Sequence, residues 1–209
     1  MTTTIVDYGM GNLRSVQKAF ELIGEPAEIS SSPTQLANAA RIVLPGVGAF
    51  RDAIAALHHH DLVNVLKDHV LADRPFLGIC LGMQLLFSHS FEDGTHEGLN
   101  LIPGSVQRFQ LPNEFKIPHM GWNQLEFPQT TPHHIFSSLP ANPWFYFVHS
   151  YHCVPNDPSW IAATTHYHSP FVSAVAKNNV TAVQFHPEKS QASGIQLLKN
   201  FLQNPPSLP

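Results

Sequence analysis

The sequence has little charge. Lys and Arg number 11 and Asp and Glu 15, so charged residues make up only 12% of the chain, and the formal net charge is -4. A globular protein carries roughly 25% charged residues. Because a basic excess is missing, the chain has no electrostatic footprint for nucleic acid or for an anionic membrane surface. We expect neither as a partner.

The chain is also poor in cysteine and lacks long apolar runs. Cys80 and Cys153 are its 2 cysteines, too few for a disulfide framework, so we expect no bridge. Residues 1–7 have neither the basic nor the apolar region of a secretory signal. No stretch approaches the roughly 18 consecutive apolar residues of a membrane span. These features predict a cytoplasmic protein.

Hydrophobic residues are plentiful, at 43% of 209 residues, which excludes intrinsic disorder. The length suits one domain, so we expect a single domain over residues 1–209 with a short disordered tail at about 204–209. The 14 histidines make the net charge sensitive to pH between about 5 and 7. The three at 58–60 lack a ligand partner in a closed motif, which favours a solvated helix end over a metal site. No cofactor is expected.

In the first half of the chain, short apolar runs alternate with amphipathic runs. The spacing predicts strands over residues 3–7, 27–30, 41–44 and 76–79, and helices over 13–23, 33–39, 50–57 and 62–71. Strands that alternate with helices are typical of a parallel sheet covered on both faces. We therefore expect an α/β fold, a three-layer α/β/α domain with a mainly parallel central sheet.

The second half differs, because after about residue 91 proline becomes denser and the apolar runs shorten. Strands are predicted over residues 105–109, 122–127, 144–148, 159–165, 171–176 and 180–185, and a closing helix over 194–202. This half is expected to add antiparallel strands to the sheet.

The segment Gly78-Ile79-Cys80-Leu81-Gly82 has the pattern of a nucleophile elbow with sulfur in place of a hydroxyl. A sharp turn from a buried strand into a helix crowds the backbone, so the flanking positions must be small. A helix continuing through Phe87 would place Cys80 at its N-terminus, where the helix dipole favours a thiolate. It would also aim the Leu81 N–H at a developing oxyanion. For Cys80 taken alone, a buried structural cysteine is the alternative.

A thiol nucleophile needs a base and a group that orients the base. The β-type stretch 180–185 runs into His186-Pro187-Glu188. In extended backbone, residues two apart point the same way, so His186 can act as the base and Glu188 can orient it. Cys80, His186 and Glu188 are thus a candidate catalytic triad. A turn, or a solvated histidine, would explain the tripeptide by itself.

Two glycine-containing loops follow predicted strands. In Pro45-Gly46-Val47-Gly48 the glycines allow a peptide to turn, so the N–H of Val47 or Gly48 can serve as a second oxyanion donor, although a plain βα turn would look the same. The loop containing Gly9 and Gly11 suggests a dinucleotide site, but Arg14 stands where the third glycine should be. The dinucleotide fingerprint therefore fails.

Beyond the triad, five segments stand out as a set. They are Asp7-Tyr8-Gly9-Met10-Gly11-Asn12-Leu13-Arg14-Ser15-Val16, Pro45-Gly46-Val47-Gly48-Ala49-Phe50, Pro118-His119-Met120-Gly121-Trp122-Asn123, Phe147-Val148-His149-Ser150-Tyr151 and Phe185-His186-Pro187-Glu188-Lys189-Ser190. With the elbow, the chain resembles the class I (triad) glutamine amidotransferases. More narrowly, from about residue 3 to 202, it is similar to the glutaminase subunits of imidazole glycerol phosphate synthases.

The resemblance implies hydrolysis of glutamine to glutamate and ammonia through a Cys80 thioester, without a cofactor. The ammonia would pass to a separate (β/α)8 synthase subunit, which makes imidazole glycerol phosphate and an aminoimidazole carboxamide ribotide in histidine biosynthesis. By the same resemblance, the glutamine pocket is formed by Gly48, Gln84, His149, Ser150 and Tyr151. The partner subunit would contact Asn12, Met120, Trp122, Tyr146 and Lys189.

Three other functions stay open at this point. A free-standing cysteine hydrolase, such as a γ-glutamyl hydrolase, would work without a partner and gives no reason for the segment 119–122. A non-catalytic amidotransferase-like module would be supported by loss of a triad member, but all three are present. The glutaminase of an anthranilate or aminodeoxychorismate synthase would share the triad and need a different partner-facing segment.

Overall fold

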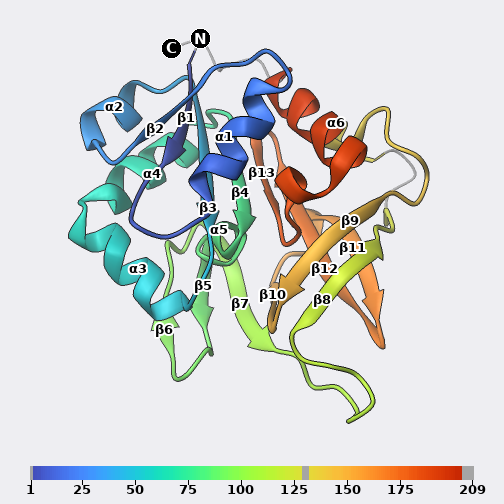
Figure 1. Cartoon of the computed structure of the whole chain (residues 1–209). Helices are drawn as coiled ribbons and strands as arrows, with labels where there is room; N and C mark the ends of the chain where they lie inside the picture. The colour runs from blue at the N-terminus through green and yellow to red at the C-terminus, as the bar shows by residue number, and fades with distance from the viewer. Residues whose placement is uncertain (1, 129–131, 204–209) are drawn as a thin grey trace.

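The first half of the chain forms the parallel part of one large sheet. The computed structural model describes residues 2–128 and 132–203. The elements of this half are β1 (Thr3–Val6), α1 (Leu13–Glu21), β2 (Ala27–Ser30), α2 (Pro33–Asn38), β3 (Arg41–Gly46), α3 (Phe50–His59), α4 (Leu62–Leu71), β4 (Phe76–Cys80) and α5 (Leu81–Gln84). Strands β2, β1, β3 and β4 lie side by side in parallel, as Figure 1 shows. The alternation of strands and helices predicted for this half is confirmed.

The second half is dominated by antiparallel pairing. Its elements, with η for 3-10 helices, are β5 (Phe87–Ser90), β6 (His96–Glu97), β7 (Ile102–Arg108), β8 (His119–Gln124), η1 (His134–Phe136), β9 (Trp144–His149), β10 (Tyr151–Pro155), η2 (Pro158–Trp160), β11 (Ile161–Tyr167), β12 (Ser169–Lys177), β13 (Val180–Val183), η3 (Pro187–Lys189) and α6 (Gln191–Leu202).

Within the described residues, the large sheet runs in the order β2-β1-β3-β4-β13-β12-β10-β7-β5-β6, with β11 paired to β12. Strand β13 joins β4 in parallel, and the order then turns antiparallel at β12. Strands β8 and β9 pair with each other as a separate antiparallel ribbon. The α/β fold with a mainly parallel sheet and added antiparallel strands is therefore as predicted.

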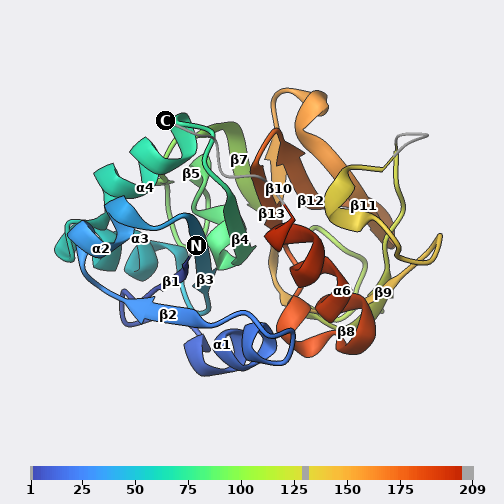
Figure 2. The same cartoon turned by 90° about the horizontal axis from the view of Figure 1, so that it is seen from above.

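Helices cover both faces of the parallel strands. Figure 2 shows α1 and α6 on one side of β1, β3 and β4, with α2, α3 and α4 on the other. Neighbouring residues of one strand supply both layers: Val43 packs in the cluster with α1 and α6, whereas Ile42 and Leu44 pack in the cluster with α2 to α4. Burial on both faces explains why these strands are continuous apolar runs.

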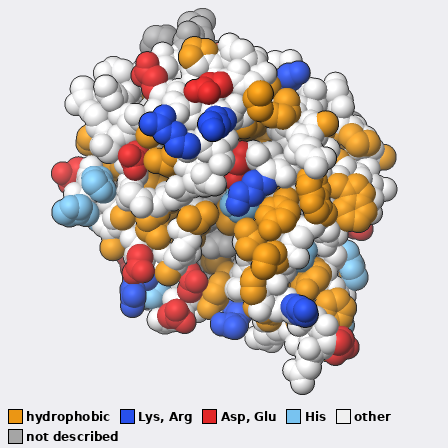
Figure 3. All heavy atoms as spheres, viewed as in Figure 1, with side chains coloured by type: hydrophobic (Ala, Val, Ile, Leu, Met, Phe, Trp, Pro, Cys, Tyr) orange, Lys and Arg blue, Asp and Glu red, His pale blue; other side chains and the backbone are white. Residues whose placement is uncertain are grey.

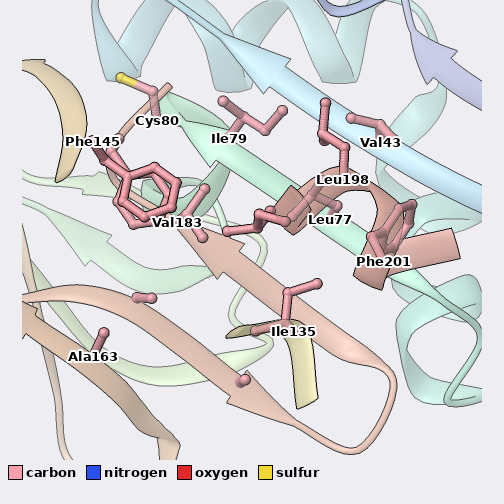
Figure 4. Close-up of a cluster of buried hydrophobic side chains, with 14 of the residues drawn as sticks. Val43, Leu77, Ile79, Cys80, Ile135, Phe145, Ala163, Val183, Leu198 and Phe201 are labelled. Carbon is pink, nitrogen blue, oxygen red and sulfur yellow. The ribbon is translucent and has the colours of Figure 1, made fainter. Parts of the chain in front are cut away.

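Cys80, the candidate nucleophile, belongs to the cluster that includes α1 and α6. In Figure 4, Val43, Leu77 and Ile79 of the sheet lie close to Leu198 of α6, and Cys80 stands at the end of β4. Leu77 and Leu198 are fully buried and Ile79 is 1% exposed. Close packing of this kind leaves β4 little freedom to move, so the position of Cys80 is set by the core.

Two predictions about local structure are wrong or incomplete, and a third is not tested. The helix after Cys80 does not reach Phe87: α5 ends at Gln84, and Phe87 begins β5, which pairs with β7. Strands β5, β6 and β10 were not predicted, because histidine, serine and proline interrupt their apolar pattern. Their long-range pairing outweighs the local signal. The tail predicted at about 204–209 lies outside the described residues.

Candidate active site

Cys80 occupies a strained turn between β4 and α5. Its backbone has φ 56° and ψ -111°, a combination that residues with a side chain seldom adopt, and the residue is 7% exposed. Glycine is required at positions 78 and 82 because a Cβ atom has no room there. A Cβ on Gly82 would collide with the Leu44 carbonyl oxygen, and one on Gly78 would lie 2.9 Å from the Ala182 Cβ. The structure therefore has the tight turn that the five-residue pattern predicted.

His186 and Glu188 form a buried pair beside this turn. The Nδ1 atom of His186 lies 2.8 Å from Oε1 of Glu188, and the two side chains are 3% and 2% exposed. The predicted reason for the contact is wrong, since Glu188 lies in the 3-10 turn η3 rather than in extended backbone. The turn brings the Glu188 carboxylate next to the His186 ring.

The environment of His186 favours its charged form. Burial lowers the pKa of His186, but the Cys80 sulfur and the Glu188 carboxylate raise it, to a net value of about 10. The second ring nitrogen, Nε2, is buried and makes no hydrogen bond to the described residues. The Cys80 sulfur is therefore close enough to the ring to raise its pKa, and no other described group engages Nε2. This leaves Nε2 available to exchange a proton with the thiol or with a bound molecule.

A buried amide next to the sulfur was not predicted. Gln184 is fully buried, and its Nε2 donates to Sγ of Cys80 at 3.6 Å. Its Oε1 accepts from Nε2 of Gln84 at 3.0 Å, which ties the two amides together. The available signal was a polar residue inside the apolar run 180–185, two positions before His186, on the same side of extended backbone.

The loop after β3 lies beside the elbow, because Gly46 at the end of β3 is paired with Cys80. Gly48 has φ 97°, and a Cβ on it would lie 2.8 Å from Cε of Met10, so this position requires glycine. The buried Tyr8 hydroxyl donates to the Pro45 carbonyl at 2.9 Å and holds the peptide that precedes the loop. On the elbow itself, α5 begins directly after Cys80, and backbone N–H groups in a first helical turn have no acceptor within the helix.

Cys80, His186 and the loop after β3 line one cavity of about 300 Å³. That volume is at the lower end of the range of about 300–1,000 Å³ that small-molecule sites occupy. The lining residues are Val47, Gly48, Cys80, Leu81, Gln84, Glu92, Pro118, Val148, His149, Ser150, Tyr151 and His186. Every residue expected in the oxyanion hole or the glutamine pocket is among them. Pro118 and Val148 belong to two of the segments that stood out in the sequence but had no expected role in the pocket, and Glu92 is an addition that the sequence did not single out.

Glu92 gives the cavity a carboxylate. Its Oε2 accepts from the backbone N of Phe50 at 2.7 Å, at the N-terminus of α3. This bond fixes one carboxylate oxygen, and the position at a helix N-terminus favours the negative charge. Glu92 follows β5, a strand that was not predicted, so its place at the cavity had no sequence signal.

The residues expected at a partner interface lie around the β8–β9 ribbon, with Asn12 at the start of α1. Met120 is 62% and Trp122 44% exposed, although both are large and apolar. Trp122 pairs with Tyr146 across the ribbon, and Nζ of Lys189 lies 5.8 Å from the Tyr146 ring centroid. Figure 3 shows hydrophobic side chains gathered on this side of the molecule, over the region of β8 and β9 in Figure 1.

Metal-binding clusters and membrane helices are both missing from the described part of the chain. Residues 2–128 and 132–203 hold no cluster of three His, Cys, Asp or Glu side chains arranged for a metal ion. None of the helices described is long and apolar enough to cross a membrane. The histidines at 58–60 are exposed, at the end of α3.

Known proteins resemble the chain over nearly its whole length. The family described as "Glutamine amidotransferase class-I" matches residues 4–204. A protein of Rhodopirellula baltica called imidazole glycerol phosphate synthase subunit HisH is 51% identical over 202 residues, covering 97% of each chain. The protein of the same name from Syntrophotalea carbinolica is 52% identical over 202 residues, covering 94% of this chain and 97% of its own.

Solved structures agree on the fold. A structure described as PurLQS from Thermotoga maritima superposes with a TM-score of 0.73 at 16% identity, covering 96% of this chain and 97% of that one. A putative GMP synthase component from Thermoplasma acidophilum gives a TM-score of 0.71 at 20% identity, with coverage of 97% and 92%. At such low identity these similarities establish the fold alone.

Proposed function

This chain belongs to the class I glutamine amidotransferase family, and on that premise we propose that it is the glutaminase subunit of an imidazole glycerol phosphate synthase. It hydrolyses glutamine to glutamate and ammonia. The ammonia passes to a (β/α)8 synthase subunit, which uses it to make imidazole glycerol phosphate and an aminoimidazole carboxamide ribotide in histidine biosynthesis. Both cysteines are free, which suits the reducing cytoplasm where we place the protein.

One observation carries the proposal for the chemistry. The strained Cys80 and the buried His186 come from distant parts of the sequence and line the same cavity, and Glu188 is bonded to His186 behind it. Backbone strain at a nucleophile and a buried titratable pair are features that concentrate at catalytic sites.

The proposed reaction has two halves. The Cys80 thiolate attacks the side-chain carbonyl carbon of glutamine, and the carbonyl oxygen becomes an oxyanion held by N–H groups of Leu81 and of the Val47–Gly48 loop. The His186 imidazolium then gives its proton to the leaving nitrogen, so ammonia departs and a thioester remains. A water that loses a proton to neutral His186 attacks the thioester, and glutamate leaves as the Cys80 thiolate and the His186 imidazolium are restored.

The remaining cavity residues fit the other end of the substrate. Glu92 supplies a negative charge for the α-ammonium group of glutamine, and Gly48, Gln84, Ser150 and Tyr151 offer hydrogen-bonding groups near the elbow. His149 lines the same cavity. Glutamine therefore lies with its amide toward Cys80 and its charged end toward Glu92.

We place the synthase subunit on the apolar face around Met120, Trp122 and Tyr146, with Asn12 and Lys189 beside it. Exposed aromatic and methionine side chains are enriched in protein interfaces. Lys189 directly follows Glu188, so a partner that engages its ammonium group lies one residue from the triad. A (β/α)8 partner at this face is adjacent to the ammonia source.

Ammonia release from glutamine by the chain with and without its synthase subunit tests the proposal. We expect the unaltered chain to release ammonia in the complex, and Cys80→Ala to lose that activity by at least about 10⁴-fold while its circular dichroism stays unchanged. The matched control is Cys153→Ala, since Cys153 is buried in β10 outside the cavity. Undiminished ammonia release by Cys80→Ala would overturn the assignment.

A further inference from the structure

A second set of histidines, separate from the triad, reaches the cavity. Nδ1 of His119 lies 3.0 Å from Nε2 of His149, and Nδ1 of His149 lies 2.8 Å from the carbonyl oxygen of Tyr151. On the other side, Nε2 of His119 lies 3.2 Å from Nδ2 of Asn123. We call Asn123, His119, His149 and the Tyr151 carbonyl the histidine chain. It runs from the β8–β9 ribbon to the cavity wall.

The direction of every hydrogen bond in the histidine chain is fixed by its ends. A carbonyl oxygen only accepts, so Nδ1 of His149 carries the hydrogen and donates to Tyr151. If the ring is neutral, Nε2 of His149 then accepts, and Nδ1 of His119 must donate to it. Nε2 of His119 in turn accepts from the Asn123 amide, whose Oδ1 accepts the Gln124 N–H at 2.8 Å. Both imidazoles are therefore Nδ1–H tautomers.

The surroundings keep both rings neutral. Burial lowers the pKa of His119 to about 4 and, against the effect of the Tyr151 carbonyl, that of His149 to about 3. The rings also pack among aromatic side chains: the His119 ring centroid lies 4.2 Å from that of Tyr167 and 5.0 Å from that of Phe147. If either imidazole were protonated, its additional N–H would have no acceptor in the histidine chain.

We infer that His119 is a positioning residue of the glutamine pocket, which through the His149 ring fixes the cavity wall formed by residues 149–151. This inference rests on the proposed function of the cavity. Both ring nitrogens of His149 are used within the protein, so His149 shapes the wall and does not bond glutamine through its ring. His119 does not touch the cavity and acts only through its neighbour.

The ribbon that carries the proposed partner face also carries the histidine chain. Met120 and Trp122 of β8 are exposed, whereas His119 is only 3% exposed and packs against the core. In β9, His149 lies directly opposite His119. One short pair of strands thus has an outer apolar face and an inner polar chain.

Three substitutions at His119 separate its two bonds. His119→Asn keeps an amide near the position of Nδ1 and so preserves the donor to His149. His119→Gln places its amide near the position of Nε2, toward Asn123, and loses that donor. His119→Phe keeps the packing against Tyr167 and removes both bonds. The matched control is His152→Phe, because His152 stacks on Phe109 at 4.9 Å and lies outside the histidine chain and the glutamine cavity.

The assays are carried out on the complex with the synthase subunit. An unsatisfied buried acceptor typically weakens a site by tenfold or more, so we expect KM for glutamine to rise by about tenfold in His119→Phe and His119→Gln, with kcat changed less than about threefold. His119→Asn and His152→Phe should keep KM near that of the unaltered protein. A purely structural role would change kcat and thermal stability together.

Alkylation of Cys80 gives a second readout. A glutamine-shaped electrophile, 6-diazo-5-oxo-L-norleucine, should label His119→Phe and His119→Gln about tenfold more slowly, because it needs the pocket wall. Iodoacetamide, which needs only the sulfur, should react at the unaltered rate in all four variants. Imidazole nitrogen chemical shifts should report Nδ1–H tautomers for His119 and His149, and a shift of the His149 Nε2 signal in His119→Phe.

Two results would overturn the inference. One is an unaltered KM and labelling rate in both His119→Phe and His119→Gln. The other is an equal loss of reactivity toward iodoacetamide and the glutamine analogue, which would place the effect on the whole site or fold. Failure of the proposed function looks different, since the unaltered complex would then release no ammonia from glutamine. Should His119→Phe fail to fold, His119→Gln and His119→Asn still decide the question.

Discussion

The cavity is bounded by two walls that handle polar groups in opposite ways. The nucleophile wall is formed by Cys80 and His186, with Glu188 bonded behind His186. The Cys80 backbone is strained, and Nε2 of His186 and Oε2 of Glu188 are buried without a hydrogen bond from the described residues. The histidine wall, formed by His149 with His119 bonded behind it, has a hydrogen-bond partner for each ring nitrogen. Burial lowers the pKa of both its imidazoles, whereas the pKa of His186 rises to about 10.

The difference shows how one fold holds imidazole in two states. A carboxylate and a sulfur beside a buried ring make its charged form favourable, and an unsatisfied nitrogen there is useful because it can carry a proton during reaction. A ring surrounded by aromatic carbon and one fixed donor stays neutral and rigid. The first arrangement suits chemistry and the second suits recognition.

The largest effect should come from neutralising the carboxylate of the nucleophile wall. Glu188→Gln keeps the shape of the side chain but removes the charge that orients and stabilises the His186 imidazolium. We expect kcat for glutamine hydrolysis in the complex to fall by about 10²–10⁴-fold, with KM little changed. The control is Glu92→Gln, which should instead raise KM. A kcat for Glu188→Gln close to the unaltered value would contradict the proposed triad.

Acid should destabilise the histidine wall. Folded His119 and His149 have pKa values of about 4 and 3, below the unfolded value of 6.5, so the unfolded chain binds more protons as the pH falls below 6.5. The free energy of unfolding therefore decreases from about pH 6.5 downward, until the pH falls below the folded pKa values. His119→Asn removes one of these titrating groups. Its free energy of unfolding should therefore decrease less steeply as the pH falls, by a slope that corresponds to up to one bound proton.

Urea unfolding at about pH 7, 6 and 5 measures that slope. His69 and His133, whose pKa values burial lowers to about 4, contribute equally to both proteins and cancel in the comparison. Parallel pH dependence of the unaltered chain and His119→Asn would show that His119 titrates normally when folded.

Strain at the elbow predicts a smaller effect on stability. At φ 56° and ψ -111° a glycine is far less strained than a residue with a Cβ. Cys80→Gly should therefore be more stable than Cys80→Ala by about 1 kcal/mol, after allowance for the greater freedom of glycine in the unfolded chain. Thermal or urea unfolding of the two inactive variants measures this difference. Equal stabilities would mean that the turn stores no strain.

The outer face of the ribbon should matter least to the isolated chain. Trp122 is 44% exposed, so Trp122→Ala should change the free energy of unfolding by no more than about 0.5 kcal/mol. Its affinity for the synthase subunit should nevertheless fall by tenfold or more, as for a buried aromatic anchor of an interface. Calorimetric titration with the partner tests this. An unchanged affinity would remove Trp122 from the proposed interface.

Much of the parallel half could be read from the sequence because its signals are local. A strand buried on both faces is a continuous apolar run, as over residues 76–79, and capping residues such as Ser32 mark a helix start, where its hydroxyl accepts from the Gln35 N–H at 3.4 Å. The glycines around Cys80 likewise record a steric requirement of the elbow itself. Such features depend on a few neighbouring residues.

The antiparallel half was harder, because its strands depend on distant partners. β10 pairs with β7 and β12, and β5 pairs with β7, although Phe87 at the start of β5 was expected to belong to the helix after Cys80. Glu92 and the bond from His119 to His149 had no local signal for the same reason. Each becomes part of the site only when strands far apart in the chain are brought together.

The amino-acid sequence alone determined that Cys80 sits in a glycine-flanked turn and that the sheet is mainly parallel. It also predicted the contact between His186 and Glu188, although for an extended backbone that the 3-10 turn η3 replaces. Only the tertiary structure decided which histidine is charged and which is neutral. The physical reason is that the pKa of an imidazole depends on burial and on the groups around the ring. For His149 those groups come from β8, β10 and other strands, which the order of residues along the chain does not bring into view.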